Sequence, residues 1–454
     1  MQWGDFRVDR EYLIKPLLDE SYKKVSHGQG VYLYDTGGKK YLDGSSGAVT
    51  CSIGHGVSEI VEAMMEQAKE VSFVYRSQFS SHAAEGLAKK LAGMTLGDLN
   101  WTFLVNSGSE AIETAMKVAI QYFQEKKMPK KTKIISRWMS YHGITIGALS
   151  LSGYPERRFR FQQLLEANPV VSPAYCYRCP YGLKPSSCRL KCTSELETAI
   201  RRVGADHVAA FVAEPIVGAA GAAITPPEGY YEKIRDICDR YDVLFIADEV
   251  MTGIGRTGKT LAMEHWGAIP DIVALGKGLS AGYAPVAATL ISDRVMRPIQ
   301  HGSKLIMSGH TYSANPQSAA VSLAVLHYIE KNHLNKAAEE KGKSLMDQLQ
   351  KLLKKTEIIG DIRGKGLLIG VEFVSNQTSK QPFPKSYNLT SRILKKAHQN
   401  GLLVYPSAAG IEGGDGDAIL IAPPLTINED EINELVQLFA KTISEIETEV
   451  LPMS

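Results

Sequence analysis

The stretch Val243-Leu244-Phe245-Ile246-Ala247-Asp248-Glu249-Val250 decides how the chain folds. Its first five residues are apolar, and an unbroken apolar run of this length is typical of a buried parallel strand. Open α/β sheets bind their ligands just beyond the carboxyl ends of such strands. Asp248 stands at that end, and a buried carboxylate is costly unless a cation meets it. We therefore expect a cationic partner near Asp248.

A second run, Asp271-Ile272-Val273-Ala274-Leu275-Gly276-Lys277-Gly278, supplies the candidate cation. Lys277 also ends a strand-like segment, and the glycines on either side leave room for a ligand to approach closely. A pyridoxal 5'-phosphate enzyme needs a lysine that forms a Schiff base and an acid that keeps the pyridine nitrogen protonated. Lys277 and Asp248 therefore predict such an enzyme.

Further strand-like runs alternate with helical patterns along most of the chain, as in a doubly wound α/β domain with a mostly parallel sheet. Residues 101–105 are one such run, and a helix pattern follows them. The pattern changes near residue 320. We expect a large cofactor-binding domain over residues 51–329 and a small α+β domain formed by residues 1–50 and 330–454.

The link between residues 101–105 and the following helix reads Asn106-Ser107-Gly108-Ser109-Glu110-Ala111. A serine before a helix with an acid in its first turn is a common N-terminal cap. A small Gly-Ser turn that opens a helix is also suited to bind phosphate, because free N–H groups and the helix dipole point at the ligand. By itself the link is compatible with both interpretations.

Composition excludes several classes of protein. The 454 residues are 44% hydrophobic and 22% charged with a net charge of +2, which predicts a soluble globular protein and neither a nucleic-acid nor a membrane-surface partner. No run of 18 apolar residues occurs, and the first seven residues carry acids and lack an apolar core, so we expect neither a transmembrane helix nor a signal peptide. Six cysteines do not indicate a disulfide scaffold. We expect a cytoplasmic enzyme.

Residues 253–260 match the nucleotide-binding pattern G-x-x-x-x-G-K-T. A true loop of this type leaves a strand directly and opens a long helix. Here Asp248 and Glu249 interrupt the approach, and Gly267 and Pro270 break the chain soon afterwards. An NTPase is therefore a disfavoured alternative.

Four cysteines are grouped in a segment rich in Pro, Gly and Tyr: Cys176, Cys179, Cys188 and Cys192. Their spacing, C-x2-C followed by C-x3-C, is compatible with a structural zinc site, but four reduced, partly buried thiols are the favoured interpretation. A zinc ion there would cross-link a loop and take no part in catalysis, so no metal is assigned to the active site.

In combination the motifs resemble the class III, fold-type I pyridoxal phosphate-dependent aminotransferases. The resemblance spans nearly the whole chain, from Leu42-Asp43-Gly44 to Ala422-Pro423-Pro424-Leu425. It is carried by the segments at residues 106–111, 141–143, 214–215, 248–250, 253–258, 276–278 and 309–312. The nucleotide-loop lookalike belongs to this set.

The resemblance implies a role for each candidate catalytic or cofactor residue. Lys277 would form the Schiff base and then move a proton between substrate and cofactor, which requires a lysine of lowered pKa. Asp248 would pair with the pyridine nitrogen. Gly108 and Ser109 would hold the phosphate.

The same resemblance places further residues around the cofactor. Tyr141 would stack on one face of the ring and Val250 would press on the other, and Glu214 would lie on the substrate side. Thr311 would bind the phosphate of the other subunit's cofactor, so that each active site needs a homodimer. We interpret His142 as a packing residue.

The sequence departs from the family pattern where substrates bind. Val49 stands near the place of a tryptophan found in many amine:pyruvate enzymes, and the Trp-Trp pair of the diaminopelargonate enzymes is missing. Those amine:pyruvate enzymes carry a mobile arginine before the Pro-Pro segment, but no arginine follows Arg392 here; residues 410–417 occupy that place. Arg256 and Arg363 are candidates to replace it, although each is more typical of a structural arginine.

The expected reaction is a ping-pong transfer of an amino group from a primary amine or ω-amino acid to a 2-oxo acid such as pyruvate. The main alternative is adenosylmethionine-8-amino-7-oxononanoate (diaminopelargonate) aminotransferase. A pyridoxal phosphate aminomutase or racemase, the P-loop NTPase and a degenerate binding protein are less favoured.

Overall fold

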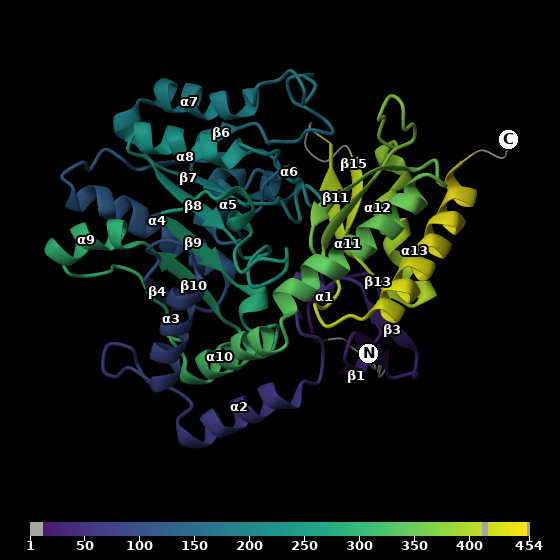
Figure 1. The fold of residues 1–454 in the computed structure, drawn as a ribbon, viewed down its shortest axis with the longest axis horizontal. Helices are drawn as coiled ribbons and strands as arrows, with labels where there is room; N and C mark the ends of the chain where they lie inside the picture. The colour runs from purple at the N-terminus through teal and green to yellow at the C-terminus, as the bar shows by residue number, and fades with distance from the viewer. Residues whose placement is uncertain (1–11, 411–415, 452–454) are drawn as a thin grey trace, which may run out of the picture.

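The computed structural model describes residues 12–410 and 416–451. Within these residues the chain forms a seven-stranded sheet and two four-stranded sheets (Figure 1). The large sheet has the order β4-β10-β9-β8-β7-β5-β6. Its strands are β4 (Trp101–Val105), β10 (Ala287–Ile291), β9 (Ile272–Leu275), β8 (Leu244–Asp248), β7 (Val208–Ala213), β5 (Lys133–Arg137) and β6 (Val170–Val171).

Neighbouring strands from β9 to β6 are parallel, and only β10 runs antiparallel to both of its neighbours, β9 and β4. The expectation of a mostly parallel, doubly wound sheet is confirmed.

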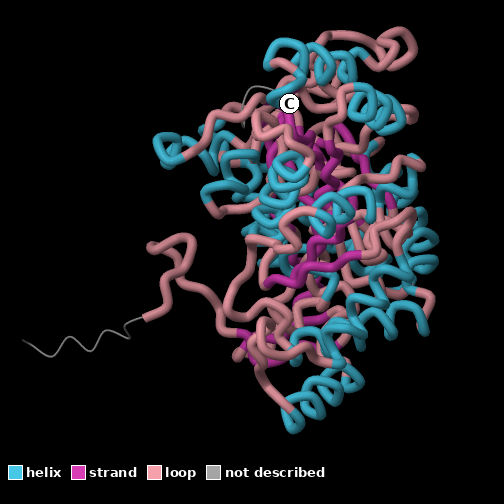
Figure 2. The backbone as a smooth tube through the Cα atoms, turned by 90° about the vertical axis from the view of Figure 1, so that its left-hand side faces the viewer, coloured by secondary structure: helices cyan, strands magenta, loops and turns pink. Residues whose placement is uncertain are grey.

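Strand β8 shows why its sequence is apolar without interruption. Alternate side chains of a strand point to opposite faces of the sheet. Leu244 and Ile246 pack in one apolar cluster with residues of α4 (Gly108–Glu125), whereas Phe245 and Ala247 pack in another with residues of α8 (Tyr230–Arg240). Because helices cover both faces, as Figures 1 and 2 show, every position of the strand is buried.

Other helices complete the layers around the large sheet. On the α4 side lie α5 (Ile146–Leu151) and α9 (Asp293–His301), and on the α8 side lie α3 (His82–Met94) and α7 (Lys191–Val203). Helices α2 (Ser58–Glu70) and α10 (Pro316–Lys331) pack on one another and with α3.

One of the two smaller sheets joins the N-terminal and C-terminal parts of the described chain, and the other is wholly C-terminal. One consists of β1 (Val25–Gln29), β2 (Tyr32–Asp35), β3 (Lys40–Asp43) and β13 (Leu402–Leu403), and β3 pairs with β13 in parallel. The other has the order β11 (Ile359–Lys365), β12 (Leu368–Phe373), β15 (Gly416–Ile421) and β14 (Tyr405–Ala409). Helices α11 (Leu334–Leu353), α12 (Leu389–Asn400) and α13 (Glu429–Val450) pack around these sheets. The domain limits at residues 50 and 330 stay a prediction.

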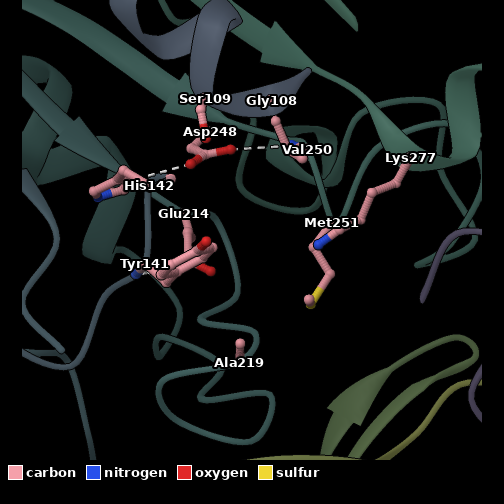
Figure 3. A pocket seen from close by; sticks show the side chains of 11 residues that line it. Gly108, Ser109, Tyr141, His142, Glu214, Ala219, Asp248, Val250, Met251 and Lys277 are labelled. Atoms are coloured by element: carbon pink, nitrogen blue, oxygen red, sulfur yellow. Dashed lines mark hydrogen bonds and ion pairs between the residues drawn. The ribbon is translucent and has the colours of Figure 1, made fainter. Parts of the chain in front are cut away.

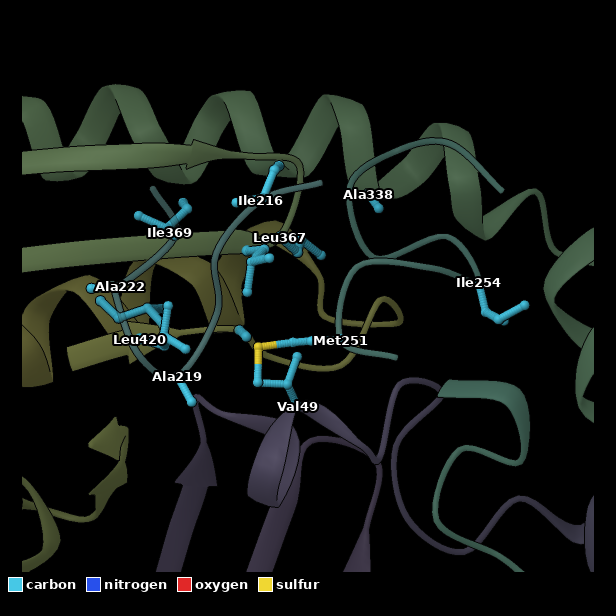
Figure 4. Packing of buried hydrophobic residues seen from close by; sticks show 14 of the residues in the cluster. Val49, Ile216, Ala219, Ala222, Met251, Ile254, Ala338, Leu367, Ile369 and Leu420 are labelled. Atoms are coloured by element: carbon cyan, nitrogen blue, oxygen red, sulfur yellow. The ribbon is translucent and has the colours of Figure 1, made fainter. Parts of the chain in front are cut away.

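A continuous apolar cluster joins the small sheets to the large one (Figure 4). Leu367, Ile369 and Leu420 from the C-terminal part lie close to Ala219 and Met251. Ala219 and Met251 belong to loops that follow strands of the large sheet. Val49, from the short helix α1 (Ser46–Val49), enters the same cluster. No helix in the described ranges has both the length and the apolar character needed to cross a membrane.

Candidate active site

Five strands of the large sheet end at one cavity of about 200 Å³ (Figure 3). Strands β4, β5, β7, β8 and β9 each carry a lining residue at or shortly after their carboxyl ends, where parallel α/β sheets place their ligands. The lining residues are Gly108, Ser109, Tyr141, His142, Gly143, Glu214, Ala219, Asp248, Val250, Met251 and Lys277.

Asp248 is held from two sides. Its carboxylate accepts a hydrogen bond from His142 Nδ1 at 2.8 Å and another from the main-chain N–H of Val250 at 3.1 Å (Figure 3). The Asp248 side chain is 5% exposed and that of His142 is fully buried. His142 is therefore more than the packing residue expected from the sequence, because it fixes the orientation of the carboxylate. His142 Nε2 has no hydrogen-bond partner among the described residues.

Lys277 enters the cavity from the side opposite Tyr141 (Figure 3). It directly follows Gly276 after β9, and its φ of 42° lies in the left-handed region, which is strained for a residue with a side chain. Burial lowers the pKa of the Lys277 amine, against the opposing charges of Asp248 and Glu214. A lowered pKa favours the neutral amine, which is the form able to attack a carbonyl or take up a proton.

Glu214 lines the cavity on the same side as Tyr141 (Figure 3). Its two carboxylate oxygens accept hydrogen bonds from the N–H groups of Tyr141 at 2.9 Å and Gly218 at 2.8 Å. Burial raises the pKa of this carboxyl. The Tyr231 hydroxyl donates to the main-chain carbonyl of Glu214 at 2.7 Å, and Arg137 donates to the same oxygen, so the backbone is fixed as firmly as the side chain.

The amino end of α4 forms another wall of the cavity. Ser107 caps the helix by accepting a bond from the N–H of Glu110 at 3.3 Å, which agrees with the capping interpretation. In the described part of the chain, the N–H groups of Gly108 and Ser109 have no acceptor, and such groups at a helix start bind anions. Val250 packs on Gly108 so closely that a Cβ there would lie 2.8 Å from Val250 Cγ1.

Seven of the eight residues expected from the sequence line this cavity, and Thr311 does not. Thr311 is exposed and lines a separate surface hollow with Tyr75 and Tyr312. Its expected role at the cofactor of another subunit stays a prediction.

Three lining residues, Gly143, Ala219 and Met251, were not among the candidates predicted from the sequence. Gly143 carries a usable signal, because it ends the Tyr-His-Gly motif and has a φ of 134°. A Cβ at Gly143 would approach Ser109 Oγ to 2.5 Å, so a side chain would disturb the helix start. Met251 simply follows Val250, and Ala219 lies in a loop without any pattern.

The two arginines considered for substrate binding are engaged elsewhere. The buried Arg256 guanidinium donates to the carbonyls of Leu367 and Pro423 and to the hydroxyl of Ser46. Arg363 pairs with Asp361 and Glu372 at 2.7 Å each. Both arginines are structural, and neither lines the cavity.

The nucleotide-loop lookalike lacks two structural features that its pattern requires, free main-chain N–H groups in the loop and a long helix after it. Within residues 253–260 the N–H of Ile254 donates to Thr260 O at 2.7 Å and that of Gly255 donates to Lys259 O at 3.1 Å. These N–H groups are used inside the loop, and only a short 3-10 helix, Ala262–Trp266, follows.

The four clustered cysteines line a separate small hollow of about 20 Å³, and neither Lys277 nor Asp248 lines it. Across the described residues, no group of three or more His, Cys, Asp or Glu side chains is arranged to hold a metal ion.

The cavity residues fit pyridoxal phosphate by their chemistry. A lysine amine, a fixed carboxylate, free N–H groups at a helix start and a tyrosine ring all face one space. Together with the doubly wound sheet they define the class of fold-type I pyridoxal phosphate enzymes.

The chain belongs to the class III aminotransferase family, because the sequence model of that family matches residues 18–443. It is a pyridoxal phosphate-dependent transaminase, an enzyme that moves an amino group from an amine to a keto acid. Among its relatives, the aminotransferase YodT of Bacillus subtilis is 56% identical over 96% of this chain and 98% of its own length.

Two further relatives carry substrate names. The adenosylmethionine-8-amino-7-oxononanoate aminotransferase of Geobacter sulfurreducens is 36% identical over 92% of this chain and 91% of its own. The putrescine–pyruvate aminotransferase of Pseudomonas aeruginosa is 32% identical over 96% and 94%. A crystal structure of an amine transaminase from an uncultivated Pseudomonas species, in its pyridoxal phosphate-bound form, superimposes with a TM-score of 0.91 at 33% identity, covering 96% of this chain and 99% of that one.

Proposed function

We propose that this enzyme transfers the amino group of a primary amine or an ω-amino acid to a 2-oxo acid such as pyruvate, in two half-reactions at one site. The observation that carries the proposal is the placement of the Lys277 amine and the Asp248 carboxylate in a single cavity at the ends of adjacent strands. The likeness to an enzyme named for putrescine and pyruvate supports this substrate class.

Each lining residue would have a defined task in holding the cofactor. Gly108 and Ser109 would bind the phosphate through the free N–H groups at the start of α4. Tyr141 and Val250 would enclose the ring, and Asp248 would meet its nitrogen. Pyridoxal phosphate, when bound, supplies an aldehyde that takes up the amino group and a ring that withdraws electrons.

Lys277 would act twice. Its amine would hold the cofactor covalently between turnovers, and it would carry a proton to and from the substrate carbon during them. Both tasks need a neutral amine, which agrees with the lowered pKa. Glu214, fixed by the N–H groups of Tyr141 and Gly218, would set the polarity on the side where the substrate enters.

The assembly and location form part of the same proposal. The enzyme would work as a homodimer in the cytoplasm, with Thr311 of the partner subunit completing the phosphate site. The separate surface position of Thr311, away from the cavity of its own chain, supports this arrangement.

Diaminopelargonate synthesis is the second candidate, favoured by the Geobacter relative. The missing Trp-Trp pair of those enzymes argues against it. S-adenosylmethionine offered as amino donor separates the two candidates, since turnover with it and none with simple amines would favour the second.

The decisive experiment follows the visible absorption of the purified holoenzyme while one amine donor at a time is added, and then pyruvate. We expect the absorption to change with primary amines or ω-amino acids and to return with pyruvate, with release of the keto product. The Lys277→Ala variant should remain folded, lose the absorption of the covalently held cofactor, and lose turnover by roughly three orders of magnitude or more. Retained turnover in that variant, or a protein that takes up no cofactor, would contradict the proposal.

A further inference from the structure

A second hollow, of about 540 Å³, lies next to the active-site cavity. Its lining comes from the segment around α6 (Pro155–Arg158), from residues 383–391, from β14 and from the start of β15. The two hollows share a wall, because the hydroxyl of Ser407 in the outer hollow donates to the carbonyl of Ala219 at 2.8 Å, and Ala219 lines the inner cavity. We call this second space the outer cavity.

Arg157 is an exposed cation in the outer cavity. Its guanidinium lies 6.0 Å from the centre of the Tyr154 ring, and it makes no side-chain hydrogen bond or ion pair with any residue in the described ranges. The adjacent Arg158 behaves differently, since its Nη1 donates to the carbonyls of Leu149, Ser150 and Ser152. Arg158 therefore anchors α6, and Arg157 is left available for a ligand.

Tyrosine rings connect Arg157 to the inner cavity. Tyr141, which lines the inner cavity, and Tyr154, which lines the outer one, pack against the same small apolar cluster. Burial raises the pKa of Tyr141 and Tyr405 and, to about 12, that of Tyr154, and the positive charge of Arg157 opposes all three shifts. The positive charge of Arg157 therefore acts on Tyr141, which lines the inner cavity.

The other arginines near the site are engaged. Arg137 donates to the carbonyl of Glu214, and Arg178 pairs with Glu372. Arg256 and Arg363 hold the internal partners described above. No arginine follows Arg392. Residues 410–417 therefore contain no counterpart of the mobile arginine of other amine:pyruvate enzymes.

We propose that Arg157 binds the carboxylate at the far end of an ω-amino acid donor. An α-carboxylate is one bond away from the reacting carbon, so its binding group must line the inner cavity, which Arg157 does not. A carboxylate several bonds from the amine would instead extend past Tyr141 into the outer cavity. There the planar guanidinium can bind it through two parallel hydrogen bonds.

Charges around Arg157 leave room for this interaction. Asp417, which lines the outer cavity, accepts bonds from both the N–H and the hydroxyl of Thr390 at 2.8 Å, so it has partners of its own. Glu156, which also lines this cavity, is exposed to solvent. This inference rests on the proposed function, and it narrows the donor to amines with a distal negative charge.

The test compares two donors of equal length on the holoenzyme, 5-aminopentanoate and 5-aminopentan-1-ol, with pyruvate as acceptor. In Arg157→Ala we expect the KM for 5-aminopentanoate to rise about tenfold to hundredfold, as the loss of a charge-assisted pair predicts. The KM values for 5-aminopentan-1-ol and for pyruvate should stay within about twofold, because neither substrate reaches the guanidinium.

Two variants and a binding measurement sharpen the result. Arg160→Ala is the matched control, since Arg160 is a nearby exposed arginine whose ring contact is with Phe159, and it should leave all KM values unchanged. Arg157→Lys should fall between wild type and Arg157→Ala. Calorimetric binding of pentanoate, which carries the carboxylate and no amine, should be lost in Arg157→Ala.

The possible failures are distinguishable. If the wild-type enzyme aminates pyruvate and Arg157→Ala raises both donor KM values equally, or neither, the assignment of Arg157 is wrong while the proposed function stands. If the wild-type enzyme uses no amine donor at all, the proposed function fails first, and with it this inference.

Discussion

The inner and outer cavities of this enzyme are lined by different kinds of structural element. The inner cavity is lined at the ends of five strands, and its carboxylates each accept two hydrogen bonds from the protein. The outer cavity is lined by the one-turn helix α6, a loop and strands β14 and β15, and the Arg157 guanidinium in it has no ionic partner among the described residues. Rigid strand ends suit chemistry that does not vary with substrate, whereas loops suit the recognition of particular substrates.

The largest effect that tests this contrast is expected from Asp248→Asn. The amide has no negative charge with which to keep the ring nitrogen protonated, so Lys277 would remove the substrate proton far more slowly. We expect kcat to fall by roughly a hundredfold or more while the cofactor still binds. Single-turnover kinetics with a saturating donor measure this step.

The control for Asp248→Asn is the neighbouring residue, Glu249. It undergoes the same carboxyl-to-amide change in Glu249→Gln, but its carboxylate accepts bonds from the Met263 N–H at 2.9 Å and the Thr252 hydroxyl and does not line the cavity. A comparable loss of kcat in both variants would mean that the inner cavity does not depend on Asp248 in particular.

Glu249 carries the second prediction, which concerns stability. Burial raises the pKa of Glu249 from 4.5 to about 7. Between these two pH values the folded protein binds more protons at this group than the unfolded chain does, so stability falls as pH rises through that range. The full change corresponds to about 3 kcal/mol.

Unfolding temperatures of wild type and Glu249→Gln, measured from pH 5 to pH 8.5 at one heating rate, test this expectation. Wild type should lose stability across the range, and the variant should lose less because its amide does not titrate. Parallel curves for the two proteins would show that another group carries the pH dependence.

The contrast between the cavities also explains what the sequence could and could not predict. Continuous apolar runs at β7, β8 and β9 indicate strands buried on both faces, and a polar residue that ends such a run is expected at the carboxyl edge. Asp248, Lys277 and Glu214 follow from that rule, and the structure places them in one cavity.

Contacts that depend on tertiary packing could not be predicted from local sequence patterns. The bond between His142 and Asp248 joins residues 106 positions apart, and no local pattern distinguishes that histidine from one buried in the core. Arg157 stands in a run that alternates basic and aromatic residues, which indicates only an exposed loop. Whether an arginine is available or engaged depends on which carbonyls and carboxylates fold against it, as Arg157 and Arg158 demonstrate. Residues 411–415, at the place of the family's mobile arginine, lie outside the described part of the chain.

The smallest effect is expected at Tyr154. Two substitutions there separate the contribution of its ring from that of its hydroxyl. The ring packs beside the Arg157 guanidinium, while its hydroxyl has no hydrogen bond to any residue in the described ranges. Tyr154→Phe should therefore leave the KM for 5-aminopentanoate within about twofold, because a phenyl ring keeps the cation–π contact. Tyr154→Ala removes the ring and lets the guanidinium move, so that KM should rise about threefold to tenfold. In both variants kcat with 5-aminopentan-1-ol should stay near the wild-type value, since the inner cavity is unaltered. If Tyr154→Ala instead lowers kcat for both donors, Tyr154 supports Tyr141 and the inner cavity, and the two spaces would have to be regarded as one.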